Sequence, residues 1–137
     1  MAERPLRSHG DGERGSAVVD FVLVSVLIVV LLLAVLQVAV YVHVRNVVTA
    51  SAQAGARYAA NADVDSAFGA PRTIEVVARA TSPQTANGLA CTSGEEADAA
   101  GLTLVVVRCT GAVPSLLASL GALLPLQATG RAIKEQA

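Results

Sequence analysis

The sequence predicts an α+β protein with a long N-terminal transmembrane helix that continues into a soluble helix, and with a small antiparallel β hairpin or sheet. Three observations predict this class. Residues 21–44 form an apolar run without a formal charge, helical spacing continues beyond it, and segments 102–108 and 127–135 have the composition of short strands. The chain has 137 residues, so only one small domain fits after the apolar run.

The apolar run 21–44 is long enough to cross a membrane. As a helix, its two dozen residues reach about 36 Å, and the apolar core of a bilayer measures about 30 Å. Many are Val or Ile, which disfavour helix in water, but a lone segment in lipid must bond every backbone amide internally and is therefore helical. The alternative is a secretory signal cleaved at Ala-Ser-Ala, residues 50–52, although the apolar part of such signals is only about 7 to 15 residues long.

Helical spacing continues past the apolar run. A narrow stripe of mostly small side chains recurs at steps of three, four or seven, namely Val44, Val48, Gly55, Tyr58 and Ala62. We therefore expect a cytoplasmic leader over 1–15, a single helix over 16–61 and a small extracytoplasmic domain over 62–137. Asn61, Asp63 and the Gly-Ala-Pro sequence at 69–71 are expected to end the helix.

The outer domain is expected to begin with one short helix. Segment 73–81 places Ile74, Val77 and Ala78 on one helical face, although Ile74, Val76 and Ala78 also alternate as a strand would. We favour the helix. Segment 83–101 combines turn-forming residues with an acidic cluster, which indicates an irregular, solvated loop.

Two later segments predict a β hairpin. Residues 102–108 are the clearest strand in the chain, and 127–135 alternate polar and small side chains. Between them, 113–126 is apolar but interrupted by proline and glycine, and it is too short for a second span. We expect the two strands to pair across it and to bury one face on the outer part of the long helix.

Composition and charge exclude several functions. The net charge is −1 and no segment collects Lys or Arg, so we expect no nucleic acid partner. Around the two histidines, His9 and His43, the sequence assembles no hydrolase or metal site. We therefore expect no enzymatic activity, no catalytic residue, no metal, no cofactor and no small-molecule substrate.

Cys91 and Cys109 are the only cysteines in the chain, and Cys109 directly follows the predicted strand at 102–108. If this region lies outside the cytoplasm, a disulfide between them is expected, because oxidising compartments favour such bonds. Two reduced, buried thiols are the alternative.

Asp20 is the one acid at the start of the apolar run. It either faces water at the positive end of the helix dipole or meets a cation, since an unpaired carboxylate is costly in lipid. A cut between Gly15 and Ser16 would create a new amine and make Asp20 the fifth residue. The ammonium and the carboxylate could then pair between neighbouring subunits.

The run 15–21, Gly-Ser-Ala-Val-Val-Asp-Phe, followed by the apolar helix, resembles the processing site of the type IV pilin superfamily. More narrowly, the chain resembles the TadE-like pseudopilins of tight-adherence pilus systems. Gln37 and the small-residue string 52–60, which contains Gly-Ala-Arg, are similar to that family over residues 14–60. The family's usual acid at the fifth mature position is Glu, so Asp20 is a departure.

This resemblance implies a minor, TadE-like component of a tight-adherence pilus assembly system. A prepilin peptidase would cut the precursor between Gly15 and Ser16 on the cytoplasmic face, and Asp20 would serve subunit pairing. The expected partners are the membrane, the peptidase and other pilin-like subunits. The expected location is the cell membrane or the pilus, as a single-pass protein with a cytoplasmic N-terminus. The alternative is a single-span anchored protein that keeps its leader and whose outer domain has a binding or structural role.

Overall fold

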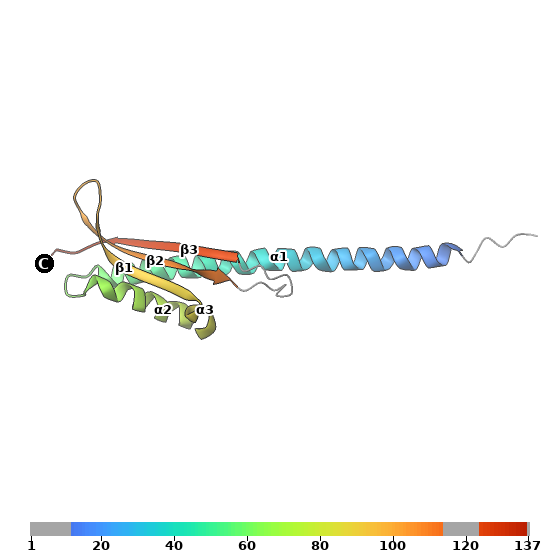
Figure 1. Cartoon of the computed structure of the whole chain (residues 1–137), viewed down its shortest axis with the longest axis horizontal. Coiled ribbons are helices and arrows are strands. Elements are labelled where there is room, and N and C mark those ends of the chain that lie inside the picture. The colour runs from blue at the N-terminus through green and yellow to red at the C-terminus, as the bar shows by residue number, and fades with distance from the viewer. Residues whose placement is uncertain (1–11, 114–123, 137) are drawn as a thin grey trace, which may run out of the picture. The chain divides into compact units, whose positions relative to one another are not determined.

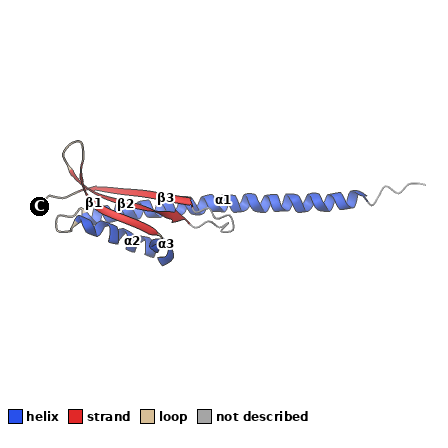
Figure 2. Cartoon of the chain, viewed as in Figure 1, coloured by secondary structure: helices blue, strands red, loops and turns tan. Residues whose placement is uncertain are grey.

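The computed structural model describes residues 12–113 and 124–136. The elements are α1 (Gly12–Ala59), a short 3-10 helix η1 (Ser66–Phe68), α2 (Gly69–Ala80), α3 (Pro83–Asn87), β1 (Leu89–Ala97), β2 (Thr103–Val113) and β3 (Leu124–Ile133) (Figure 2). The predicted leader and the apolar segment 113–126 lie mostly outside the described residues. The chain divides into two units, Met1–Leu36 and Gln37–Ala137.

The long helix is confirmed, and it begins four residues before the predicted start at residue 16. Seventeen large apolar side chains between Val18 and Val42 are at least 45% exposed. The Ser25 hydroxyl donates to the Phe21 carbonyl at 2.8 Å, so this polar group is satisfied inside the helix. The predicted end at 61 is close to the observed end at Ala59.

The second half of α1 buries a face of small residues. The buried members are Val48, Ser51, Ala52, Gly55, Ala56 and Ala59, and Ala60 directly after the helix is buried as well. The predicted stripe was correct at Val48 and Gly55 but wrong at Tyr58 and Ala62, which are exposed. Tyr58 lies outside the buried face because the sheet packs against the neighbouring alanines. Only small side chains allow the sheet to approach α1 closely there.

A three-stranded antiparallel sheet with the order β1-β2-β3 packs on this face (Figure 1). The predicted hairpin is confirmed, because β2 pairs with β3 from Leu104↔Ile133 to Val113↔Leu124. Alternate residues of both strands are buried, among them Val105, Val107, Leu126 and Ala128. The hairpin therefore buries one face against α1, as expected.

The predicted loop at 83–101 is wrong, since the segment forms α3 and β1. Ser82 caps α3, because its hydroxyl accepts from the Thr85 backbone N–H at 3.1 Å, and Pro83 fits the first turn. Strand β1 pairs with β2 over nine residues from Leu89↔Gly111 to Ala97↔Thr103. Its acidic and small residues leave it half-exposed, and the backbone pairing with β2 makes it a strand despite that composition.

The predicted helix at 73–81 is confirmed as α2, but α2 begins at Gly69, four residues before the predicted start. The sequence Gly-Ala-Pro at 69–71 begins this helix and does not end the previous one. Glycine at position 55 makes the contact between α1 and α2 possible. A Cβ there would lie 2.1 Å from the Thr73 hydroxyl oxygen and 2.5 Å from the Gly69 carbonyl oxygen.

The two cysteines form a disulfide across β1 and β2, with an S–S distance of 2.02 Å. Cys91 and Cys109 are directly opposite in the strand register, so the predicted pair is present. An ion pair joins the same strands, with Arg108 Nη2 3.0 Å from Glu96 Oε2. The hydrogen bond from Arg108 lowers the pKa of the Glu96 carboxyl, and the carboxylate raises the pKa of Arg108.

Hydrogen bonds from three side chains join the edge strand β3 and its C-terminal extension to α1. The Tyr41 hydroxyl donates to the Pro125 carbonyl at 3.1 Å. The Gln53 amide donates to the Arg131 carbonyl at 2.6 Å and accepts from the Arg131 N–H at 3.1 Å. Lys134 Nζ donates to the carbonyls of Ala59, Asn61 and Val64 just after α1 ends. These bonds satisfy backbone groups that an edge strand and a helix C-terminus leave free.

Candidate functional site

The residues predicted to carry function are grouped near the start of α1. Gly15, Ser16 and Asp20 are helical and exposed. Ser16 and Asp20 are four residues apart and therefore lie on the same face of the helix. Among side chains in 15–113 and 124–136, no ion pair includes Asp20, so its carboxylate is open to a partner outside this part of the chain.

Gly15 is not required by packing. A Cβ built at this position meets no heavy atom within 4 Å among the described residues. By contrast, a Cβ at Gly130 would lie 2.2 Å from backbone atoms of Ala52. Glycine in a helix costs about 0.5–1 kcal/mol relative to alanine, so Gly15 weakens the helix without a compensating contact here.

The exposed apolar surface starts two residues after Ser16. Helix Gly15–Ala59 contains a window with a mean hydropathy of 3.2, none of which is buried within the chain. Patches of this size are not found on ordinary soluble monomers. The helix therefore has the length and composition to cross a membrane and fits a single-pass membrane protein, with Asp20 at one end of the apolar surface.

The cysteine pair belongs to the other unit and has a structural role. Cys109 is buried and Cys91 is half-buried, and both pack with the core between the sheet and α1. The bond closes the chain between β1 and β2 with a sequence separation of 18. It fixes the register of the strand that the sequence failed to predict.

Sequence reasoning missed Tyr41, Gln53 and Lys134 as residues that hold the unit Gln37–Ala137 together. Each bonds to backbone atoms at least 70 positions away in the sequence. One signal was visible for Lys134, because it is the only lysine in the chain and lies near the end of the last predicted strand.

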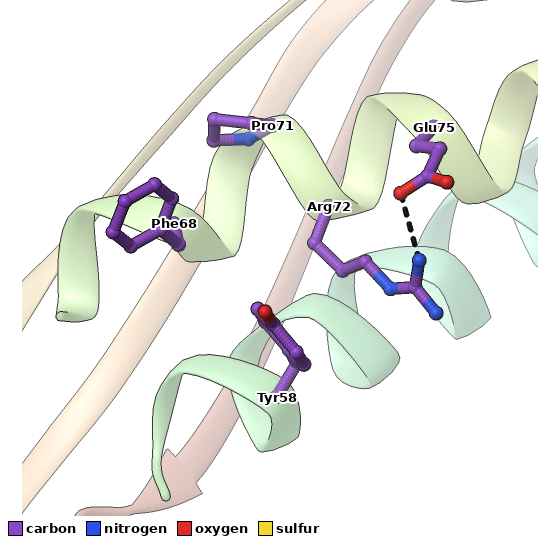
Figure 3. Close-up of a pocket in the computed structure, with 5 residues that line it drawn as sticks. All are labelled: Tyr58, Phe68, Pro71, Arg72 and Glu75. Atoms are coloured by element: carbon purple, nitrogen blue, oxygen red, sulfur yellow. Dashed lines mark hydrogen bonds and ion pairs between the residues drawn. The ribbon is translucent and has the colours of Figure 1, made fainter. Parts of the chain in front are cut away.

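A shallow depression of about 190 Å³ lies beside the end of α1, lined by Tyr58, Phe68, Pro71, Arg72 and Glu75 (Figure 3). The Arg72 guanidinium lies 5.5 Å from the centre of the Tyr58 ring and 2.7 Å from the Glu75 carboxylate. Glu75 also pairs with Arg79. The two arginines and Glu75 neutralise one another at the surface, so their arrangement needs no bound ligand to explain it.

A comparison with protein families matches residues 15–57 to the family described as TadE-like protein. No curated protein and no solved structure matches the chain. The matched segment contains the predicted cut, Asp20, the exposed apolar surface and most of the small-residue face that packs on the sheet. It confirms the resemblance seen in the sequence. Over residues 15–57, the chain is therefore similar to the TadE-like family of pilus-associated, pilin-like structural components.

Proposed function

We propose that this protein is a minor pilin-like subunit of a tight-adherence pilus system, processed by a prepilin peptidase between Gly15 and Ser16. The observation that supports it most is the exposed apolar surface between Val18 and Val42, which begins directly after the cut. In the membrane this surface faces lipid. In a fibre it packs against the same surface of other subunits, as apolar helices do in bundles.

Gly15 supports processing by a partner enzyme. The fold leaves open space where a side chain would lie, so packing within the chain does not explain glycine there. A peptidase that grips the leader backbone needs close approach, which a Cβ blocks. Because Gly15 and Ser16 lie in the first turns of α1, which starts at Gly12, the peptidase has to unwind this end before cutting.

Asp20 is proposed to pair with the new Ser16 amine of a neighbouring subunit. In the leader-bearing precursor this amine does not exist, so the pair forms only after the cut. Between apolar helices the pair is poorly screened, and removing one charge would strand the other at a cost of about 3–5 kcal/mol. Asp20 would thus restrict assembly to subunits from which the leader has been removed.

We propose that the N-terminus is cytoplasmic and the unit that contains the sheet lies outside. A disulfide between adjacent strands is typical of oxidising compartments. A secretory signal cleaved after Ala52 is disfavoured, because Ala52 is fully buried within α1 and a cut there would divide the core. The leader-retaining anchored protein remains the competing function.

The test compares Asp20 variants in cells that make pili. Asp20→Asn and Asp20→Ala are expected to insert and accumulate normally but to be lost from sheared surface fibres. Asp20→Glu should restore recovery, because it supplies the acid usual in this family. Asp63→Asn is the control, since Asp63 is an exposed acid in the outer unit. Wild-type recovery of Asp20→Asn in the fibres would contradict the charge pair.

A further inference from the structure

We propose that one end of the sheet rests on phospholipid headgroups. This surface, which we call the membrane-facing end, consists of Tyr41 and Arg45 of α1 and of Leu124, Pro125 and Gln127 of β3. The proposal goes beyond a role in the pilus and uses only one part of the proposed function, namely that α1 spans a membrane.

Strand β3 lies along α1 and runs in the same direction (Figure 1). Tyr41 bonds to Pro125 at one end and Gln53 bonds to Arg131 further along. From 41 to 53 the helix rises about 18 Å, and from 125 to 131 the strand advances about 20 Å. The two advances agree, so a position in β3 corresponds to a height along α1.

The hydrocarbon boundary falls at the start of this contact. Twenty helical residues counted from Phe21 end at Val40, and they reach about 30 Å, the thickness of the bilayer core. Val40, Tyr41 and Val44 are partly buried against the core beneath the sheet. The protein therefore covers one side of the last residues of the apolar run, while Val42 on the other side stays exposed, and Pro125 lies at the height where headgroups begin.

The side chains at this height suit a lipid surface. Tyrosine is favoured at membrane interfaces, and a cation just outside the hydrocarbon attracts phosphate groups. Tyr41, Arg45, Pro125 and Gln127 line a shallow depression of about 270 Å³, and Arg45 is the only charged residue among those that line it. No carboxylate in its lining would oppose an anionic headgroup.

The strand pair ends at the same height. Val113 and Leu124 are the last partners in the register of β2 and β3. Leu124 is apolar and half-buried, so the described end of β3 adds no charged group to the membrane-facing end.

Tryptophan fluorescence tests the proposal, because the natural chain contains no tryptophan. Single tryptophans are placed in the full-length protein at Pro125, Gln127 and Ile133, which are all exposed positions of β3, and at Val30 within the apolar run. Each variant is reconstituted in phosphatidylcholine vesicles with some phosphatidylglycerol. The acyl chains carry bromine both near the headgroup and near the chain end, and it quenches tryptophan at short range.

We expect strong quenching for Val30→Trp, clear quenching for Pro125→Trp, less for Gln127→Trp and none for Ile133→Trp, which lies about 26 Å further along the strand. Quenching of Val30→Trp alone would overturn the proposal and leave the membrane span intact. An absence of quenching in all four variants would instead contradict the membrane span on which the proposed function rests. Equal quenching of Pro125→Trp and Ile133→Trp would also overturn the proposal, because equal quenching requires a sheet that lies flat on the bilayer.

Discussion

Gly130→Ala should damage the contact between the sheet and α1. Gly130 is buried in β3, and an added Cβ would lie 2.2 Å from the carbonyl carbon and oxygen of Ala52 and 2.4 Å from the backbone nitrogen of Gln53. Ordinary contact begins at 3.4 Å, so the shortfall is about 1.2 Å. Backbone in a helix cannot rotate aside as a side chain does, and the strand has to move away.

The cost can be estimated from the packing that this movement disrupts. A gap of about 0.5–1 Å already forfeits a quarter to a half of a dispersion contact, and Leu126 and Ala128 on the same strand would lose such contacts with α1. Overpacking of this kind costs about 1–3 kcal/mol, and we expect the upper end. With an m-value of about 1.5 kcal/mol/M, the urea midpoint should fall by roughly 2 M.

Gly94→Ala is the matched control. Gly94 also lies in a strand, neither glycine has a positive φ, and a Cβ at Gly94 meets no heavy atom within 4 Å among the described residues. The assay is pulse proteolysis of the full-length protein in detergent micelles across a urea series. Equal midpoints for Gly130→Ala and the wild type would refute the argument, and so would an equal loss in Gly94→Ala.

The remaining predictions concern the bonds that hold the unit Gln37–Ala137 together, and the same assay measures them. Reduction of the Cys91–Cys109 disulfide should destabilise the unit by about 3 kcal/mol in the chain-entropy model, since the sequence separation is 18. The double variant Cys91→Ala with Cys109→Ala should be equally weakened and insensitive to reductant. If reductant lowered the urea midpoint of this double variant, the reductant would be acting on something other than the disulfide. Lys134→Met should cost about 2 kcal/mol, because three carbonyls at the end of α1 lose a charged donor. Glu135→Gln, one residue away, should change little, and a loss as large as that of Lys134→Met would count against the capping role.

The long helix and the β2–β3 hairpin could be predicted because their signals are local. An apolar run of membrane length and the β-rich segment 102–108 specify their own structures. Strand β1 could not be predicted in this way. Its sequence, Leu-Ala-Cys-Thr-Ser-Gly-Glu-Glu-Ala, is that of a loop, and pairing with β2 and the disulfide make it a strand. Such non-local pairing is absent from any short window of sequence.

The same distinction between local and non-local signals applies to the candidate site. Gly15, Ser16 and Asp20 could be proposed as candidates from the sequence because they form a compact motif before an apolar run. The small residues around Gly55 were recognised as a pattern, but their cause is the close approach of the sheet and α2, with Thr73 and Gly69 beside Gly55. The roles of Gln53 and Lys134 depend on which backbone atoms lie opposite, and only the fold supplies those.

The central claim is that a peptidase removes the leader after Gly15, and the intact mass of the protein from pilus-producing cells tests it most directly. We predict a wild-type mass that corresponds to residues 16–137, allowing for the two hydrogens lost in the disulfide. Gly15→Leu should retain residues 1–15 while still inserting, because the fold has open space at this position. Gly94→Leu, which also faces open space, should be processed as the wild type is. A wild-type mass that includes the leader, or removal of the leader from Gly15→Leu, would contradict the account.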